Sequence, residues 1–429
     1  MKKTTKKIYR QRIADQLLER KLRGKGAVLI EGAKWCGKTT TAEQIAKSVF
    51  YMSEMGKTDQ NVQLAKINPK YVLNGARPRL IDEWQLVPEL WDSIRWEADH
   101  AGQFGLFILT GSSVPADMSN VYHSGTGRFA WLRMRPMSLW ESGDSTGEVS
   151  LAGLFNGAEM VEGMCSNDLE RMAFLVCRGG WPQAVNCDVD VALDQSFDYV
   201  DAVKKRDIQA VDGVSRNQEM VHRFMRSYAR MQGAQASFGT IRADLQTNES
   251  DSLTEETIGA YVKALKNIFV IEDSLAWNPN LRSKTAIRTS DTRYFTDPSI
   301  ATAALGVGPQ DLMGDLETFG LLFETLCIRD LRVFADALYG NVYHFRDKNG
   351  LECDAVVHLR DGRYGLIEIK LGGDNLVREG AESLKKLAKS IDTTKMKKPS
   401  FLMVLTAVGP YAYKRDDGVF VVPIGCLKD

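Results

Sequence analysis

The chain has 429 residues, of which 44% are hydrophobic and 26% are charged, a composition typical of globular domains with ordinary cores. Lys plus Arg and Asp plus Glu are equal at 55 each. This balance argues against a uniformly basic nucleic-acid-binding surface, although a local basic patch is compatible with it. No apolar run in the sequence approaches the ~20 residues that span a bilayer, and no apolar stretch of a signal peptide follows the basic start MKKTTKKIYR. The seven cysteines include no C-x-x-C pair, so we expect reduced thiols in a cytoplasmic protein with no membrane partner.

Residues 28–44, VLIEGAKWCGKTTTAEQ, predict a buried strand, a glycine-bounded loop and a helix. Gly32, Gly37, Lys38 and Thr39 complete the pattern G-x-x-x-x-G-K-[ST], in which glycines let backbone N–H groups turn toward phosphate oxygens. We expect Lys38 to reach the β- and γ-phosphates and the Thr39 hydroxyl to ligate Mg²⁺. The alternative is a tight strand–helix turn without a ligand. The predicted cradle for ATP consists of Gly32, Ala33, Lys34, Trp35, Cys36, Gly37, Lys38, Thr39 and Thr40.

A second predicted strand ends in two carboxylates, Asp82 and Glu83, within RLIDEWQLVPELW. Asp82 suits the outer sphere of the Mg²⁺ held by Thr39, and Glu83 suits a base that orients the attacking water. The alternative is an acidic turn of the kind that ends many strands.

The next apolar run, GLFILTGSS, ends in the hydroxyl side chains of Thr110, Ser112 and Ser113. Open α/β sheets bind ligands beyond the carboxyl ends of their strands, so we expect Thr110 or Ser112 to sense the γ-phosphate. Arg128 follows in HSGTGRFAW and is a candidate for an arginine that stabilises the transition state, either within its own subunit or in a neighbouring one. The alternative for Arg128 is a purely structural role.

Taken in order, the motifs run KKIYRQRIADQLLERKL, VLIEGAKWCGKTT, LIDEWQLVPELW, FILTGSS, GTGRFAWLRMRPMSLWE, RGGWPQAV and KKRDIQ. In this order they resemble a family of prokaryotic AAA-type P-loop ATPases with a C-terminal domain of unknown function, over nearly the whole chain. The resemblance implies an ATPase core, a helical lid, a winged-helix segment and a terminal domain similar to the restriction-endonuclease-like PD-(D/E)XK nucleases. Many relatives have an Arg-Gln pair where this chain has Lys34 and Trp35, a departure that leaves the phosphate ligands of the motif intact.

We therefore predict an α/β protein in four parts. These are a P-loop NTPase (AAA-type) domain at residues 1–145, a helical lid at 146–214, a winged-helix-like segment at 215–285 and a restriction-endonuclease-like α/β domain at 286–429.

The middle of the chain reads as helical, with a break predicted at Gly179, Gly180 and Pro182. Three helices and a β segment, IFVIEDSLAW, follow in the outline of a winged helix–turn–helix. Its third helix would present side chains for salt-sensitive phosphate contacts, although such a module also serves in protein docking or packing. These side chains are Thr257, Tyr261, Lys263 and Lys266.

Near the C-terminus, the pair Asp361-Gly362 predicts a hairpin turn between two strands. Asp354 lies on the first strand, and Glu368 and Lys370 share one face of the second because they are two residues apart. Two carboxylates could hold Mg²⁺ while Lys370 steadies the water that attacks a phosphodiester, and Glu324 on the preceding helix could add a third oxygen ligand. The alternative is an inherited scaffold that binds partners or regulates the ATPase.

These motifs predict an enzyme that hydrolyses the β–γ bond of ATP with Mg²⁺, as a nucleotide-gated switch whose C-terminal half binds DNA or protein. Three alternatives remain. They are an ATP-gated DNA nuclease, a signalling or scaffold ATPase without nucleic-acid activity, and a nucleotide-binding module that hydrolyses almost nothing. The sequence defines neither the partner nor the state of self-association.

Overall fold

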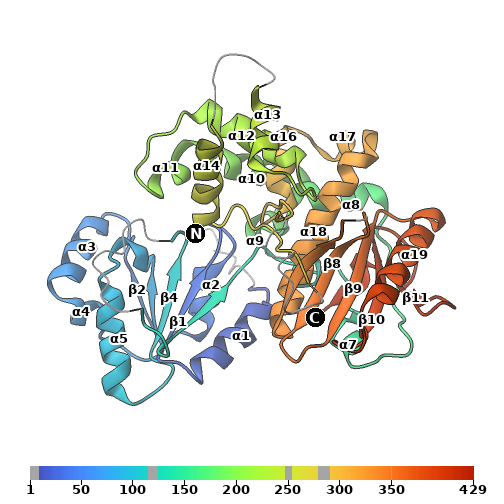
Figure 1. The fold of residues 1–429 in the computed structure, drawn as a ribbon. Coiled ribbons are helices and arrows are strands. Elements are labelled where there is room, and N and C mark those ends of the chain that lie inside the picture. The colour runs from blue at the N-terminus through green and yellow to red at the C-terminus, as the bar shows by residue number, and fades with distance from the viewer. Residues whose placement is uncertain (1–8, 115–123, 247–253, 279–289, 349) are drawn as a thin grey trace. The chain divides into compact units, whose positions relative to one another are not determined.

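The computed structural model describes residues 9–114, 124–246, 254–278, 290–348 and 350–429. The chain divides into two compact units, Met1–Arg135 and Pro136–Asp429, and Figure 1 labels many of their helices and strands. Among the described helices, none is long and apolar enough to cross a membrane.

The first unit is built on a five-stranded sheet with the order β2-β3-β4-β1-β5, in which every pair is parallel. The strands β1 and β4, AVLIE and FILTG, are almost wholly buried, as expected for strands covered on both faces. The elements are α1 (Ile13–Leu22), β1 (Ala27–Glu31), α2 (Lys38–Ile45), β2 (Ser48–Tyr51), α3 (Thr58–Ile67), α4 (Pro69–Leu73), β3 (Arg79–Asp82), η1 (Trp84–Leu86), α5 (Leu90–Ala101), β4 (Phe107–Gly111) and β5 (Phe129–Arg133).

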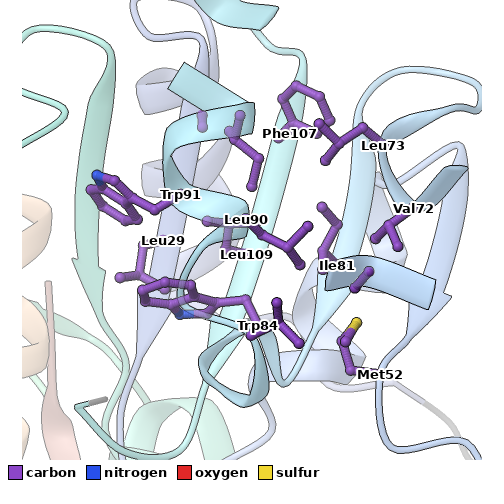
Figure 2. Packing of buried hydrophobic residues seen from close by; sticks show 14 of the residues in the cluster. Leu29, Met52, Val72, Leu73, Ile81, Trp84, Leu90, Trp91, Phe107 and Leu109 are labelled. Carbon is purple, nitrogen blue, oxygen red and sulfur yellow. The ribbon is translucent and has the colours of Figure 1, made fainter. Parts of the chain in front are cut away.

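Aliphatic and aromatic side chains together form one core of this sheet, where the turn after β3 meets helix α5 (Figure 2). The Trp91 ring stacks on Phe129 with ring centroids 3.7 Å apart, and Trp84 lies 5.3 Å from Trp91. Large aromatic rings contribute more buried area than any other side chain. Their packing therefore holds the short turn after β3, and with it Glu83, in a defined position.

The helical part of the second unit contains the predicted break. Helix α8 ends at Arg178 with Gly179 as its C-cap, and α9 begins at Pro182, so the break is confirmed. A Cβ on Gly180 would lie 2.1 Å from the Met137 carbonyl oxygen, which explains why a residue without a side chain stands there. The helical elements are α6 (Leu139–Ser142), α7 (Leu151–Phe155), α8 (Leu169–Arg178), α9 (Pro182–Val185), α10 (Val189–Ala202), η2 (Val203–Asp207), α11 (Ile208–Ala210), α12 (Gln218–Arg230), α13 (Phe238–Gln246), α14 (Glu255–Asn267), α16 (Pro298–Leu305), α17 (Pro309–Gly314), α18 (Leu316–Ala337) and α19 (Asp374–Ser390).

Helices α12, α13 and α14 are followed by two antiparallel bridges, which join Ile271 to Phe295 and Ser274 to Thr292. Thr254 caps α14 by accepting a hydrogen bond from the Thr257 backbone N–H, which satisfies one of the free donors at the helix start. The elements expected here, three helices and then a β segment, are therefore present.

A six-stranded mixed sheet with the order β11-β12-β10-β9-β8-β7 forms the C-terminal part. Helix α18 packs on β7 and β8, and α19 packs on β9 and β10. The hairpin predicted at Asp361-Gly362 is confirmed, because β8 and β9 pair antiparallel and the Leu359 N–H donates to the Arg363 carbonyl. The strands and the last short helix are β7 (Gly340–Arg346), β8 (Glu352–Leu359), β9 (Tyr364–Lys370), β10 (Phe401–Thr406), β11 (Tyr413–Lys414), β12 (Phe420–Pro423) and η3 (Ile424–Cys426).

A small parallel pair, β6 (Val149–Ser150) with β13 (Leu427–Lys428), joins residues far apart in the sequence. The Ser145 hydroxyl donates to the Leu427 carbonyl at 2.8 Å beside it. The start and the end of the second unit are therefore held together by backbone pairing.

A buried group of charges lies where α18 meets the Gly180 turn. The Arg329 guanidinium is 2.9 Å from Asp297 and 2.7 Å from Asp330, and all three side chains are almost fully buried. Asp297 also accepts the Gly180 N–H and Asp330 accepts the Leu139 N–H. Buried charges persist only when they are paired and hydrogen-bonded, so this cluster fixes α6, α16 and the Gly180 turn on α18.

Acid should weaken the second unit through His344 on β7. Burial lowers the pKa of this histidine and outweighs the Ser274 carbonyl and Asp291, which raise it. The unfolded chain, with a pKa near ~6.5, therefore binds a proton that the folded state resists. Neutral His344 therefore makes its full contribution to the free energy of unfolding above the unfolded pKa. This contribution is lost as the pH falls below that pKa, by at most ~1.4 kcal/mol per pH unit.

We expect urea unfolding to show a shallower loss of stability between pH 7 and pH 5 in His344→Leu than in the wild type. His100→Leu, which removes an exposed histidine, should keep the wild-type slope. Parallel slopes for all three proteins would contradict the assignment to His344.

Candidate nucleotide site

The phosphate loop lies directly between β1 and α2. A Cβ on Gly32 would lie 2.0 Å from the Met134 carbonyl oxygen, so only glycine fits where the loop leaves β1. Gly37 has a φ of 100°, and Trp35 is left-handed with a φ of 67° and a side chain 48% exposed. The loop therefore places Trp35 on the surface and keeps its own backbone close to the end of β5.

Two features of the loop suit an anion. Helix α2 starts at Lys38 with no side-chain cap, which leaves its first N–H groups available to an anion such as a phosphate. The Lys38 ammonium is buried and donates to the carbonyls of Gly32 and Ala33 at 2.9 and 2.8 Å. This lysine is therefore held over the concave side of the loop by the loop itself.

Asp82, at the end of β3, joins three segments of the site. Its Oδ1 atom accepts hydrogen bonds from the Thr39 and Thr110 hydroxyls, each at 2.6 Å. These residues come together because β3 pairs with β4 so that Asp82 lies opposite Thr110. A hydroxyl and a carboxylate side by side are oxygen donors of the kind that Mg²⁺ prefers, so the predicted pair Thr39 and Asp82 fits this ion.

Glu83 follows with a left-handed backbone, φ 57° and ψ 44°, a conformation that non-glycine residues adopt mainly where the surroundings impose it. Its Oε2 atom accepts hydrogen bonds from Ser112 at 3.1 Å and from the Gln85 amide. The two predicted γ-phosphate sensors thus differ in their contacts: Thr110 reaches Asp82, whereas Ser112 reaches Glu83. Gln85 had no part in the sequence prediction, although it stands two residues after Glu83.

Arg128 does not lie with these residues. It directly precedes β5, whose first residue Phe129 pairs with Ala27 at the start of β1, whereas the phosphate loop follows the end of β1. Its guanidinium pairs with Asp99 at 2.5 Å and is half exposed. Arg128 therefore lies at the opposite end of the strands from the phosphate loop, where it cannot act on a nucleotide bound by its own loop.

Sequence reasoning also missed the contacts of the N-terminal segment with the loop. The Arg12 guanidinium donates to the Cys36 carbonyl at 2.9 Å. The Tyr9 hydroxyl is 2.9 Å from that of Thr41 on α2. The stretch KKIYRQR was part of the family resemblance, but no local pattern connects it with a loop that lies some twenty residues further along the chain.

Some of the α14 side chains that were predicted to contact nucleic acid make contacts within the protein instead. Tyr261 is buried and stacks on Phe224 with centroids 5.3 Å apart. Lys266 pairs with the buried Asp273 at 2.8 Å. Lys263 is exposed and Thr257 is half-buried, so only part of the predicted set faces outward.

The four predicted C-terminal residues do come together. The pairing of β8 with β9 ends at Ala355 and Ile367, and Asp354 and Glu368 follow directly beyond it. The Lys370 ammonium is 3.3 Å from Asp354 and 2.7 Å from Glu368. Glu324 on α18 accepts a hydrogen bond from the Tyr294 hydroxyl.

Burial and the Asp354 carboxylate raise the pKa of Glu324 well above its ordinary value. The same two causes raise the pKa of Glu368 to about 8. Among the described residues, no three His, Cys, Asp or Glu side chains converge closely enough to hold a metal ion by themselves. Lys370 thus serves as the internal counter-ion of a crowded carboxylate cluster.

Three models of protein families match parts of the chain. An AAA domain matches residues 24–142, a domain of unknown function (DUF8612) matches residues 169–311, and another (DUF4143) matches residues 319–427. No curated protein matches the chain. One similar solved structure is the Walker-type ATPase PABY2304 of Pyrococcus abyssi, with 15% identity over 68% of this chain and 94% of that chain and a TM-score of 0.41. That likeness is too weak to support an inference.

The AAA match covers the phosphate loop, Asp82, Glu83 and Thr110. Residues 24–142, which include the phosphate loop, are therefore similar to an AAA domain, and residues 319–427 are similar to the domain DUF4143.

A methyl group at Gly32 should disturb the loop, because a Cβ there would lie 2.0 Å from a backbone oxygen that cannot rotate away. We expect Gly32→Ala to lower the stability of the first unit by about 1–3 kcal/mol and to weaken nucleotide binding. Gly24→Ala is the matched control, because its Cβ would meet no atom within 4 Å. Thermal unfolding and nucleotide titration of both variants check this expectation, and equal behaviour of the two would refute it.

Proposed function

We propose that the chain is a Mg²⁺-dependent ATPase that works as a nucleotide-gated switch, with a C-terminal half that binds DNA or a protein partner. The observation that carries the proposal is the convergence of the Thr39 and Thr110 hydroxyls on Asp82 beside an open helix N-terminus. An oxygen-rich corner next to backbone N–H donors suits a phosphate chain and its metal ion.

In this proposal residues 32–40 cradle the phosphates and Lys38 neutralises the β- and γ-phosphates. Thr39 and Asp82 would hold Mg²⁺, which supplies positive charge against the phosphate oxygens. Glu83 orients a water molecule and accepts its proton as the water oxygen bonds to the γ-phosphorus. The bond from that phosphorus to the β–γ bridging oxygen breaks, which yields ADP and phosphate.

Ser112 and Gln85 hold the Glu83 carboxylate by hydrogen bonds. Thr110 donates to Asp82 at the base of the site. A γ-phosphate would be a new acceptor for hydroxyl donors at this edge. We therefore assign γ-phosphate sensing to Thr110 or Ser112, and Arg128 to action on a nucleotide in a neighbouring subunit, which requires self-association.

The division into an ATPase domain at residues 1–145, a lid at 146–214, a winged helix at 215–285 and a nuclease-like domain at 286–429 belongs to the same proposal. Three helices followed by paired β segments support the winged helix. The order α18, β7, β8, β9, α19 and β10, with Glu324, Asp354, Glu368 and Lys370 gathered at one place, supports the PD-(D/E)XK-like domain.

A second function, ATP-gated cleavage of DNA, is favoured by that same gathering. Two carboxylates and a lysine at the end of paired strands can hold Mg²⁺ and a water molecule against a phosphodiester. The contrasting possibility is a scaffold, in which Lys370 only neutralises the buried carboxylates. Its close approach to both Asp354 and Glu368 is compatible with either role.

ATP turnover tests the primary proposal. We expect Lys38→Ala to lose turnover through loss of phosphate binding. Glu83→Gln should keep nucleotide binding but lower kcat by about 10²–10⁴-fold, the usual contribution of a positioned base. Glu19→Gln, an exposed control on α1, should stay near the wild-type rate. Phosphate release and binding of fluorescent ADP measure both quantities, and full turnover by Glu83→Gln would refute the role of Glu83.

DNA cleavage and ATP turnover in one tube, with Mg²⁺ or Mn²⁺, separate the two functions of the C-terminal half. A nuclease predicts that cleavage disappears in Glu368→Ala and Asp354→Ala and changes in Lys38→Ala. ATP turnover should fall only in Lys38→Ala. DNA left intact by the wild type would remove the nuclease and leave a binding role.

A further inference from the structure

We infer that residues 133–135, where the chain leaves the first compact unit, report the state of the phosphate loop to the rest of the chain, and that Arg12 is the positioning residue that couples them. We call residues 133–135 the exit segment. The inference rests on the proposed nucleotide binding at the loop. It adds the contacts through which a structural change at the loop is transmitted to the second unit.

The exit segment contacts both the loop and the end of β1, the strand that leads into it. The Met134 N–H donates to the Glu31 carbonyl at 2.8 Å, and the Cys36 thiol lies 3.6 Å from the Met134 carbonyl oxygen. A Cβ on Gly32 would lie 2.0 Å from that same oxygen. Arg133 pairs with Glu31 at 3.3 Å. The exit segment is therefore in direct contact with the start of the loop.

Arg12 bridges the same two segments. Its Nη1 atom donates to the Cys36 carbonyl and its Nη2 atom to the Arg135 carbonyl, each at 2.9 Å, and the side chain is only 4% exposed. A guanidinium is planar and rigid, so its two donors keep a fixed separation. A shift of the Cys36 carbonyl would therefore strain one of these two hydrogen bonds or move Arg135 with it.

The rest of the N-terminal segment holds Arg12 in place. The Asp15 carboxylate accepts the Arg12 N–H at 2.8 Å and the Tyr9 hydroxyl at 2.6 Å. The Tyr9 hydroxyl is also 2.9 Å from that of Thr41 on α2. The bridge is thus attached both to the loop and to the helix that follows it.

A phosphate chain acts on both attachments. To bind phosphate, the loop turns its N–H groups inward, and each peptide plane carries its carbonyl in the opposite direction. Packed, hydrogen-bonded contacts switch between discrete arrangements rather than stretch. The exit segment lies at the end of this series of contacts and continues at Pro136 into the second unit.

Amide hydrogen exchange of the full chain tests the coupling. The reporter is the Met134 amide, which donates to Glu31, and the probes are MgADP and Mg²⁺ with a non-hydrolysable ATP analogue. In the wild type we expect the exchange rate of Met134 to differ by about tenfold between the two nucleotides, as for a local opening that a ligand biases. An unchanged rate at Met134, with protection of the loop amides, would overturn the inference.

Substitutions of Arg12 test whether this residue couples the loop to the exit segment. Arg12→Met should keep loop protection by nucleotide and keep KM for ATP within about threefold, while the difference at Met134 falls below about twofold. Arg12→Lys, which can reach one carbonyl at a time, should give an intermediate difference. Arg23→Met removes an exposed arginine after α1 and should behave as the wild type.

The outcomes separate this inference from the proposed function. Absence of both turnover and loop protection in the wild type would reject nucleotide binding itself and the inference with it. Normal turnover with an Arg12→Met response equal to that of the wild type would reject the coupling alone. If Arg12→Met does not fold, Cys36→Ala removes instead the thiol contact of the loop with the Met134 carbonyl, and the wild-type comparison of the two nucleotides still decides the role of the exit segment.

Discussion

The carboxylate of Asp82 is the point on which the nucleotide site depends, because it is the acceptor shared by the helix after the phosphate loop and by the neighbouring strand. Thr39 and Thr110 both donate to the same oxygen atom. This shared acceptor holds the start of α2 next to the ends of β3 and β4. A nearly buried carboxylate is tolerated only with such donors. The hydrogen bonds that satisfy this carboxylate therefore also place two hydroxyl oxygens beside it.

The C-terminal cluster also contains buried carboxylates, but their charge is compensated differently. Glu324, Asp354 and Glu368 lie close together, and Lys370 rather than hydroxyl groups compensates their charge. Burial and the neighbouring carboxylate raise the pKa of Glu368, because both disfavour its charged form. A cation that enters would compete with the Lys370 ammonium for the carboxylates, whereas at Asp82 it would compete only with the hydrogen bonds from two hydroxyl groups. The two sites therefore differ in what a metal ion must replace.

Local patterns predicted the parts of this protein that depend on local physics. The loop at residues 32–40, the break after Arg178 and the hairpin at Asp361-Gly362 follow from glycine conformation and apolar periodicity. The place of Arg128 was not predicted, because it depends on the parallel pairing of β5 with β1, two strands far apart in the sequence. The contacts of Arg12 with the loop likewise arise from tertiary packing, as does the bond from Tyr294 to Glu324.

The pairing of β6 with β13 has a consequence for how the protein is made. Synthesis proceeds from the N-terminus, and every strand of the first sheet has been produced once Arg133 is added. That sheet can close while the remainder is still being translated. Val149 and Ser150, in contrast, have no strand partner until Leu427 and Lys428 leave the ribosome. A pause late in translation would therefore leave a folded nucleotide-binding unit joined to an unfinished one.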